Sequence, residues 1–184
     1  MNSETALIVA AQKGSVSAFT KLIGSYREGL FRFLVTRVSS YADAEDVLQD
    51  TLVNAYRYLH SYDAKWRFST WLYRIALNNV TRLRTLTMDD NIDVDELGDA
   101  EAGPLEQCIA VSDSENLWVS ARRVLNDDVY TAMWLRYVED MSVNDIAAVL
   151  ERSISWTKVN LMRARQQLET ELNRSPKSTS RAYG

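Results

Sequence analysis

The chain has 184 residues, of which 46% are hydrophobic and 25% charged, enough to fill the core of one medium domain or two small ones. Its one cysteine, Cys108, excludes an internal disulfide and a multi-cysteine zinc site. No apolar run approaches the roughly 18 residues that a membrane span needs. Because an acid, Glu4, stands where a signal peptide would carry positive charge, we expect a cytoplasmic protein.

The net charge of −4 hides an uneven distribution along the chain. Residues 1–84 hold 11 Lys and Arg against 7 Asp and Glu, a net of +4. Residues 85–121 hold 10 acids and no Lys or Arg, a net of −10, and residues 122–184 hold 10 bases against 8 acids, a net of +2. Two basic blocks that flank an acidic strip permit a nucleic-acid partner, although the whole chain is acidic.

Apolar residues at helical spacing predict several helices in the first half of the chain, enough to close one core. Ser40 and Asp43 form a capping-box pair that would begin one of them. The predicted helices cover residues 3–12, 17–38, 40–59 and 69–86.

The second half of the chain opens on a predicted linker. Residues 87–112 contain two glycines, a proline and many acids, a composition typical of a flexible segment. The helical pattern returns over residues 113–173, and residues 174–184 are predicted to be a disordered tail. The sequence therefore predicts an all-α fold of two small helical domains, residues 1–86 and 113–173.

The end of the second domain has the layout of a helix-turn-helix. Ser142 and Asp145 form a second capping-box pair, and the helix that they begin runs to Leu150. A break at residues 151–153 precedes another helix over residues 155–172. Four residues of this last segment are expected to pack on the preceding helix at Ile146, Ala147 and Leu150. They are Ile154, Val159, Met162 and Leu168.

The second helix of such a motif enters the DNA major groove and contacts base edges with its N-terminal half. Cations and short polar side chains suit that role, and here they are Thr157, Lys158, Asn160, Arg163 and Arg165. An ordinary amphipathic hairpin with a solvated basic face is the alternative interpretation.

Two segments of the first domain also suggest binding. Residues 66–84, WRFSTWLYRIALNNVTRLR, interleave aromatics with arginines, a mixture that suits unstacked bases. Arg74, Asn78 and Arg82 recur every four residues and so share one stripe, whereas Phe68 and Trp71 have the spacing of core residues. The other segment places four acids in the first two turns of a helix, where the helix dipole alone would favour them; they are Asp43, Glu45, Asp46 and Asp50.

Taken together and in this order, the three segments resemble the extracytoplasmic-function sigma factors of the sigma-70 family. AEDVLQDTLVNAYR is similar to the polymerase-binding helix of that family, and FSTWLYRIALN is similar to its promoter-melting helix. The hairpin that ends in MRARQQL resembles its DNA-reading domain. The resemblance covers residues 4–84 and 118–172, and it implies a transcription initiation factor that directs core RNA polymerase to promoters.

The resemblance implies three sets of site residues. The set that would contact the coiled coil of the polymerase β′ clamp is Asp43, Asp46, Gln49, Asp50 and Val53. The set that would bind the minus-ten element is Lys65, Arg67, Arg74, Asn78 and Arg82. A base flipped from the stack would be captured by the bend at residues 63–68. The set that would bind the minus-thirty-five element is Ser155, Thr157, Lys158, Asn160, Arg163 and Arg165.

The resemblance also implies partners. They are core RNA polymerase, through its β′ clamp and β flap, promoter DNA, and an inhibitory anti-sigma factor of a kind that is often membrane-anchored. We expect a monomer when no partner is bound, with no cofactor, no small-molecule substrate and no catalytic activity. Asn160 stands where many relatives carry Arg, and Trp156 and Thr157 replace a smaller pair, so the promoter sequence is not predicted.

A conventional helix-turn-helix regulator is the alternative function. Its first domain would sense a ligand or dimerise, but this leaves the acidic helix and the FSTW segment unexplained. An enzyme is disfavoured because the one histidine, His60, has no matched carboxylate or thiol nearby in the sequence. The sequence also has no Gly-rich phosphate loop and no metal-ligand spacing.

Overall fold

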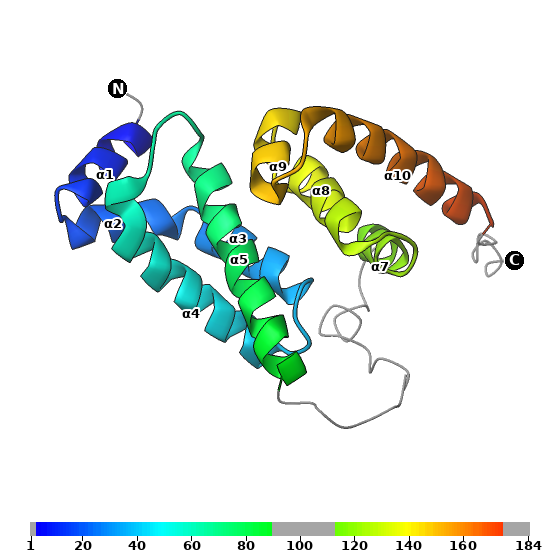
Figure 1. Cartoon of the computed structure of the whole chain (residues 1–184), viewed down its shortest axis with the longest axis horizontal. Coiled ribbons are helices and arrows are strands. Elements are labelled where there is room, and N and C mark those ends of the chain that lie inside the picture. The colour runs from blue at the N-terminus through cyan, green and yellow to red at the C-terminus, as the bar shows by residue number, and fades with distance from the viewer. Residues whose placement is uncertain (1–2, 90–112, 175–184) are drawn as a thin grey trace, which may run out of the picture.

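The computed structural model describes residues 3–89 and 113–174, which form two groups of helices (Figure 1). The first group is α1 (Ser3–Gln12), α2 (Val16–Gly24), α3 (Arg27–Val35), α4 (Tyr41–Tyr58), the short 3-10 helix η1 (Leu59–Ser61) and α5 (Phe68–Asp89). The second group is α7 (Asp113–Val124), α8 (Asp127–Tyr137), α9 (Val143–Leu150) and α10 (Ile154–Arg174). These residues contain no strand, and the predicted all-α, two-domain fold is confirmed.

The predicted linker and tail lie outside the described residues, apart from their first positions, into which α5 and α10 extend. In the described part of the chain, no group of three or more His, Cys, Asp or Glu residues could hold a metal ion. No helix in that part is both long enough and apolar enough to cross a membrane.

The predicted helix over residues 17–38 is wrong, because the structure divides it into α2 and α3. The break follows Gly24, a residue with low helix propensity. The Ser25 hydroxyl donates to the Leu22 carbonyl at 2.8 Å, and the Tyr26 N–H donates to the Ile23 carbonyl at 2.9 Å. These short-range bonds end α2, and Tyr26 then turns inward to pack on Phe68, with ring centroids 5.5 Å apart.

Both predicted helix starts are confirmed by their caps. The Ser40 hydroxyl accepts the Asp43 N–H at 3.0 Å at the start of α4, and the Ser142 hydroxyl accepts the Asp145 N–H at 3.1 Å at the start of α9. Each bond satisfies one of the N–H groups that a first helical turn leaves without a partner.

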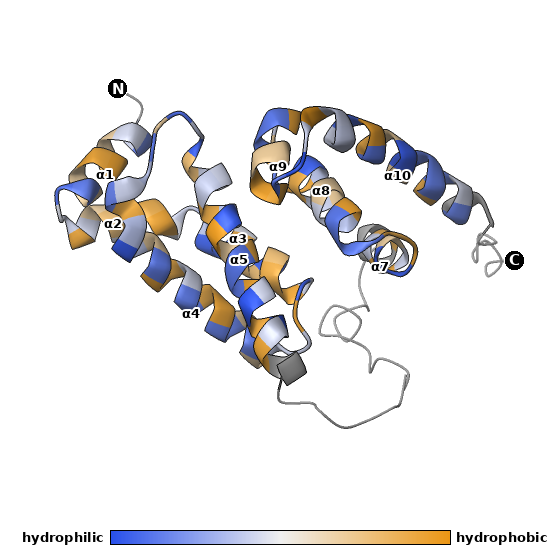
Figure 2. Cartoon of the chain, in the orientation of Figure 1, coloured by the Kyte–Doolittle hydropathy of each residue, from blue (hydrophilic) through white to orange (hydrophobic). Residues whose placement is uncertain are grey.

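The first domain is built around the packing of α4 on α5. Leucines and aromatics from α3 and α5 fill its centre, among them Leu30, Phe33 and Leu72, each fully buried. Between α4 and α5 the Asn79 amide donates to the Thr51 hydroxyl at 3.1 Å, so this buried polar pair is hydrogen-bonded. Figure 2 shows apolar and polar residues alternating along each helix, as amphipathic helices around a core require.

In the second domain α10 packs on α8 and α9. The side of α10 that faces inward carries Thr157, Leu161, Ala164 and Leu168, all buried. The prediction that Ile154, Val159 and Met162 pack on α9 is therefore wrong, since 46%, 39% and 55% of their surfaces are exposed. Only Leu168 of that predicted set is buried, at 6% exposure.

The turn between α9 and α10 is set by Glu151, which has left-handed backbone angles of φ 54° and ψ 38°. That conformation lets the Arg152 N–H return to the Ala147 carbonyl at 3.0 Å and ends α9. The two helices of the motif are consequently joined by a tight, hydrogen-bonded turn.

The two domains are in contact, mainly through α5 and α9 (Figure 1). Their buried hydrophobic residues form one contiguous cluster. The helix that resembles the promoter-melting helix is therefore partly covered by the first helix of the helix-turn-helix.

Candidate nucleic-acid and polymerase interface

Four of the five predicted polymerase-binding residues share the outward face of α4. Its inward face carries Ala44, Val47 and Thr51, all buried, and at 100° per residue the opposite side holds Asp46, Gln49, Asp50 and Val53. The three polar members are exposed, and Val53 is 41% exposed. Asp43 differs from them: it is half-buried, and its N–H is used in the α4 cap.

Four of the five predicted minus-ten residues carry a positive charge, and all five are exposed on α5 or on the loop before it. The loop is ordered by the Tyr62 hydroxyl, which donates to the Trp66 carbonyl at 2.6 Å, and by the Asp63 carboxylate, which accepts the Lys65 N–H at 3.0 Å. Phe68 is 1% exposed and packs with the rings of Tyr62 and Trp71, so it is a core residue. The exposed aromatic of this region is Trp66, at 39%.

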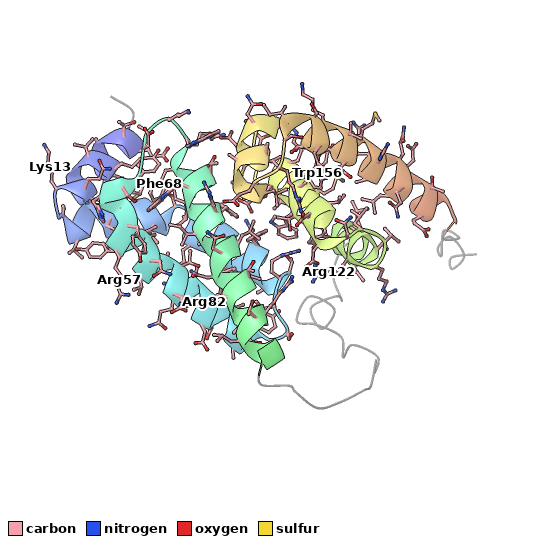
Figure 3. The ribbon with its side chains drawn as sticks, viewed as in Figure 1. Lys13, Arg57, Phe68, Arg82, Arg122 and Trp156 are labelled. Carbon is pink, nitrogen blue, oxygen red and sulfur yellow. The ribbon has the colours of Figure 1, made fainter. Side chains whose placement is uncertain are left out.

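Two arginines of this set are already paired. Arg82 is labelled in Figure 3. It donates to Asp50 of α4 at 2.5 Å, which joins a predicted DNA contact to a predicted polymerase contact within the first domain. Arg74 pairs with Glu151 in the turn of the helix-turn-helix. Both side chains are about half exposed, so other partners can compete for them.

The predicted minus-thirty-five residues do not share one face of α10. Ser155, Lys158 and Arg163 are exposed. The Asn160 amide is half-buried and donates to the Trp156 carbonyl at 2.9 Å, and Arg165 lines a groove between α7, α8 and α10.

Thr157 corrects the predicted set. It is 0% exposed, and its hydroxyl donates to the Ser153 carbonyl at 3.1 Å. The side chain lies on the inward side of α10, between this helix and the rest of the second domain, and so stabilises the helix-turn-helix. The prediction that it contacts DNA is therefore wrong for this structure.

Sequence reasoning missed an acid at the domain contact, Asp127 in the first turn of α8. Its carboxylate lies 3.3 Å from Arg37 and 2.8 Å from Arg122, and it also pairs with Arg84 of α5. Arg84 in turn donates to the Arg37 carbonyl at 2.9 Å. One carboxylate thus joins cations from three different segments, and no local spacing in the sequence could have indicated it.

The charges around Asp127 shift its pKa and that of Arg37. Burial raises the pKa of the Asp127 carboxyl, but the attraction of Arg37, Arg84 and Arg122 outweighs this, so the pKa lies below its usual value. Burial lowers the pKa of Arg37 to about 10, and the charge of Asp127 opposes that change. Both groups are charged at neutral pH and form an ion pair.

Two further polar contacts join the domains. The Thr70 hydroxyl of α5 donates to the Asp145 carboxylate of α9 at 2.8 Å, and both residues are buried. Burial and a hydrogen bond to Glu139 raise the pKa of the Tyr73 hydroxyl, so it remains a neutral donor. A Cβ at position 29 would lie 3.2 Å from a Glu139 oxygen and 3.3 Å from the Tyr73 hydroxyl, so Gly29 leaves the room that this contact uses.

Two family models match the chain: Sigma-70 region 2 at residues 22–86 and Sigma-70 region 4 at residues 123–168. The sigma-E factor of Haemophilus influenzae, an extracytoplasmic-function RNA polymerase sigma factor, is 28% identical over 181 residues, which cover 92% of this chain and 95% of the relative. The chain belongs to the extracytoplasmic-function sigma factors. It is accordingly a transcription initiation factor. The match to a sigma factor covers 92% of the chain and therefore excludes the alternative of a conventional helix-turn-helix regulator.

Solved structures of sigma factors share the fold. CnrH, solved with the cytosolic domain of CnrY, has a TM-score of 0.68 and 22% identity over 95% of this chain and 99% of its own. RpoE of Bartonella quintana, solved with the anti-sigma factor NepR, has a TM-score of 0.65 and 24% identity over 87% of this chain and 99% of its own. The region 2 match runs from the end of α2 through α3 and α4 to most of α5, and the region 4 match runs from the end of α7 through α8 and α9 to most of α10.

Proposed function

We propose that this sigma factor binds core RNA polymerase through the outward face of α4 and promoter DNA through α5 and α10. The observation that carries the proposal is the shared exposed face of Asp46, Gln49, Asp50 and Val53, opposite the buried side of α4. Acids around one exposed apolar residue suit a basic coiled coil, since arginine and carboxylate form strong charge-assisted hydrogen bonds.

DNA binding would use both domains. Exposed cations on α5 and its preceding loop can neutralise phosphates near an opened minus-ten element, and Trp66 offers a ring for stacking with an unpaired base. Lys158 and Arg163 on α10 would serve the same role at the minus-thirty-five element. No catalytic group is required for either task.

One more polymerase contact and one more partner belong to the proposal. A groove of about 550 Å³ in region 4 offers a docking place for an apolar segment of the polymerase β flap; it is lined by Leu117, Trp118, Met133, Tyr137, Arg165, Leu168 and Glu169. An anti-sigma factor would hold the protein inactive, and its support is the fold shared with a sigma factor that was solved with NepR.

The proposal is tested by co-elution of the full chain with bacterial core RNA polymerase in size-exclusion chromatography. We expect the native chain to co-elute and the double variant Asp46→Arg, Gln49→Ala to lose most of that binding. The matched control is Glu28→Arg, a similar charge reversal at an exposed position of α3, where the side chain is 86% exposed. Thermal unfolding of each variant verifies that it is folded.

The possible outcomes test separately whether the protein binds polymerase and whether it does so through α4. Native co-elution that only the α4 variant weakens supports the proposed face. If both variants bind as tightly as the native chain, docking lies elsewhere on the protein. No co-elution of a folded native chain contradicts the proposed polymerase binding itself.

A further inference from the structure

Two apolar side chains lie in the middle of the outward face of α10. The buried residues Thr157, Leu161, Ala164 and Leu168 define the inward side of this helix. At 100° per residue, Val159 lies almost directly opposite that side, and Met162 lies next to it, one turn further along. Of their surfaces, 39% and 55% are exposed, and neither packs in the buried cluster of the described residues.

Their neighbours indicate what covers these apolar groups. Lys158 and Arg163 flank the pair on either side, and Ser155 lies one turn before Val159 on the same face. Residues 154–168 contain three cations and no acid. An apolar centre between cations complements a polyanion with an apolar group on its contact surface, and α10 is the second helix of a helix-turn-helix.

The DNA major groove presents one such group. The 5-methyl of thymine is the apolar feature of the base-pair edges there, whereas the other groups are hydrogen-bond donors and acceptors. We propose that Val159 and Met162 recognise thymine methyl groups in the minus-thirty-five element, while Lys158 and Arg163 hold the phosphates on either side. This specificity rests on the proposed promoter binding and adds to it the base that these two positions select.

The expected effect of one methyl group can be estimated. Burial of one methylene-sized group contributes about 0.8 kcal/mol, and each 1.4 kcal/mol changes a dissociation constant tenfold. Loss of one buried methyl should therefore weaken binding by about fourfold.

The test replaces thymine with uracil, which removes the methyl and keeps every hydrogen-bonding group of the base. Holoenzyme made from the full native chain and core polymerase first selects DNA from duplexes with a randomised minus-thirty-five region. Each thymine of the selected element, on either strand, is then replaced singly by deoxyuridine, and binding is measured by competition. We expect about fourfold weaker binding at one or two positions of the element.

Substitution of Val159 and Met162 tests whether these two side chains cause the weaker binding of the uracil duplexes. Val159→Ala and Met162→Ala should each bind the thymine duplex about as weakly as the native holoenzyme binds the uracil duplex, with no further loss at the matching uracil. Alanine keeps the helix propensity of α10 high. The matched control is Val16→Ala, an exposed valine of α2 at 60%, which should leave the full thymine preference.

Each outcome bears on one statement. If no thymine of the selected element responds to uracil, or if both α10 variants keep the native preference, methyl recognition by Val159 and Met162 is wrong. If the holoenzyme selects no sequence over the minus-thirty-five region, the proposed DNA contact of α10 fails first, before any methyl is tested.

Discussion

Arg37 is a cation buried at the domain contact, with a side chain only 4% exposed, and Asp127 supplies its counter-charge. Asp127→Asn would leave that buried charge without its ion-pair partner, which is costly. Because the Asp127 side chain is 44% exposed, solvent screens part of the loss, and we expect the free energy of unfolding to fall by about 1–3 kcal/mol. Urea unfolding measures the change.

The adjacent residue provides the control. Asp128 also lies in the first turn of α8, but it pairs with Arg152, whose side chain is 51% exposed. Asp128→Asn should therefore cost less than about 1 kcal/mol. Equal losses for the two variants would show that the helix dipole, rather than the buried Arg37, determines the effect.

The same carboxylate makes a pH-dependent contribution. The pKa of Asp127 is lowered in the folded chain, so its stabilising effect is complete above the unfolded pKa of about 4. That effect is lost as the pH falls through the folded pKa, where the carboxylate takes up a proton. The difference in unfolding free energy between native chain and Asp127→Asn should stay constant from pH 7 to 5 and shrink below about pH 4. A difference that persists unchanged at pH 3 would exclude the ion pair as its source.

At the scale of single elements, α9 is short and depends on its cap. Its eight residues follow the N-cap residue Ser142, whose hydroxyl accepts the Asp145 N–H at 3.1 Å. Ser142→Ala should destabilise the chain by about 1 kcal/mol and speed amide hydrogen exchange within α9. Ser40→Ala removes the equivalent cap of α4 and should speed exchange in α4 instead. Faster exchange in both helices from either variant would argue against separate local effects.

The helices themselves could be predicted well because hydrophobic spacing and capping pairs are local signals. Two local predictions were wrong for physical reasons: the Gly24 and Ser25 break divides one expected helix, and the rotation of α10 exposes Val159 and buries Thr157. A valine and a threonine have similar shapes, so their pattern alone does not determine which faces the core. The Asp127 contacts could not be predicted, since their partners lie up to 90 residues away in the sequence.

At the scale of the whole molecule, the domain contact occupies part of the surface proposed for DNA. Arg74 of α5 pairs with Glu151, and together with Trp66 and Arg152 they line a cavity of about 670 Å³ between the domains. Promoter DNA that lies along this part of α5 would have to displace α9. The described arrangement is therefore a closed one, and the ion pairs between the domains favour it.

Charge reversal at that contact should open the molecule. Glu151→Arg places a cation beside Arg74, replacing an attraction of exposed charges worth up to about 1 kcal/mol with a repulsion of similar size. The population of separated domains should rise several-fold, measured as lower energy transfer between dyes at Lys13→Cys and Gln166→Cys in a Cys108→Ser background. The exchanged pair Arg74→Glu with Glu151→Arg restores the attraction and should restore the transfer. If the exchanged pair stays as open as the single variant, backbone strain at residue 151 rather than charge would explain the opening, because Glu151 holds a left-handed conformation with φ 54°.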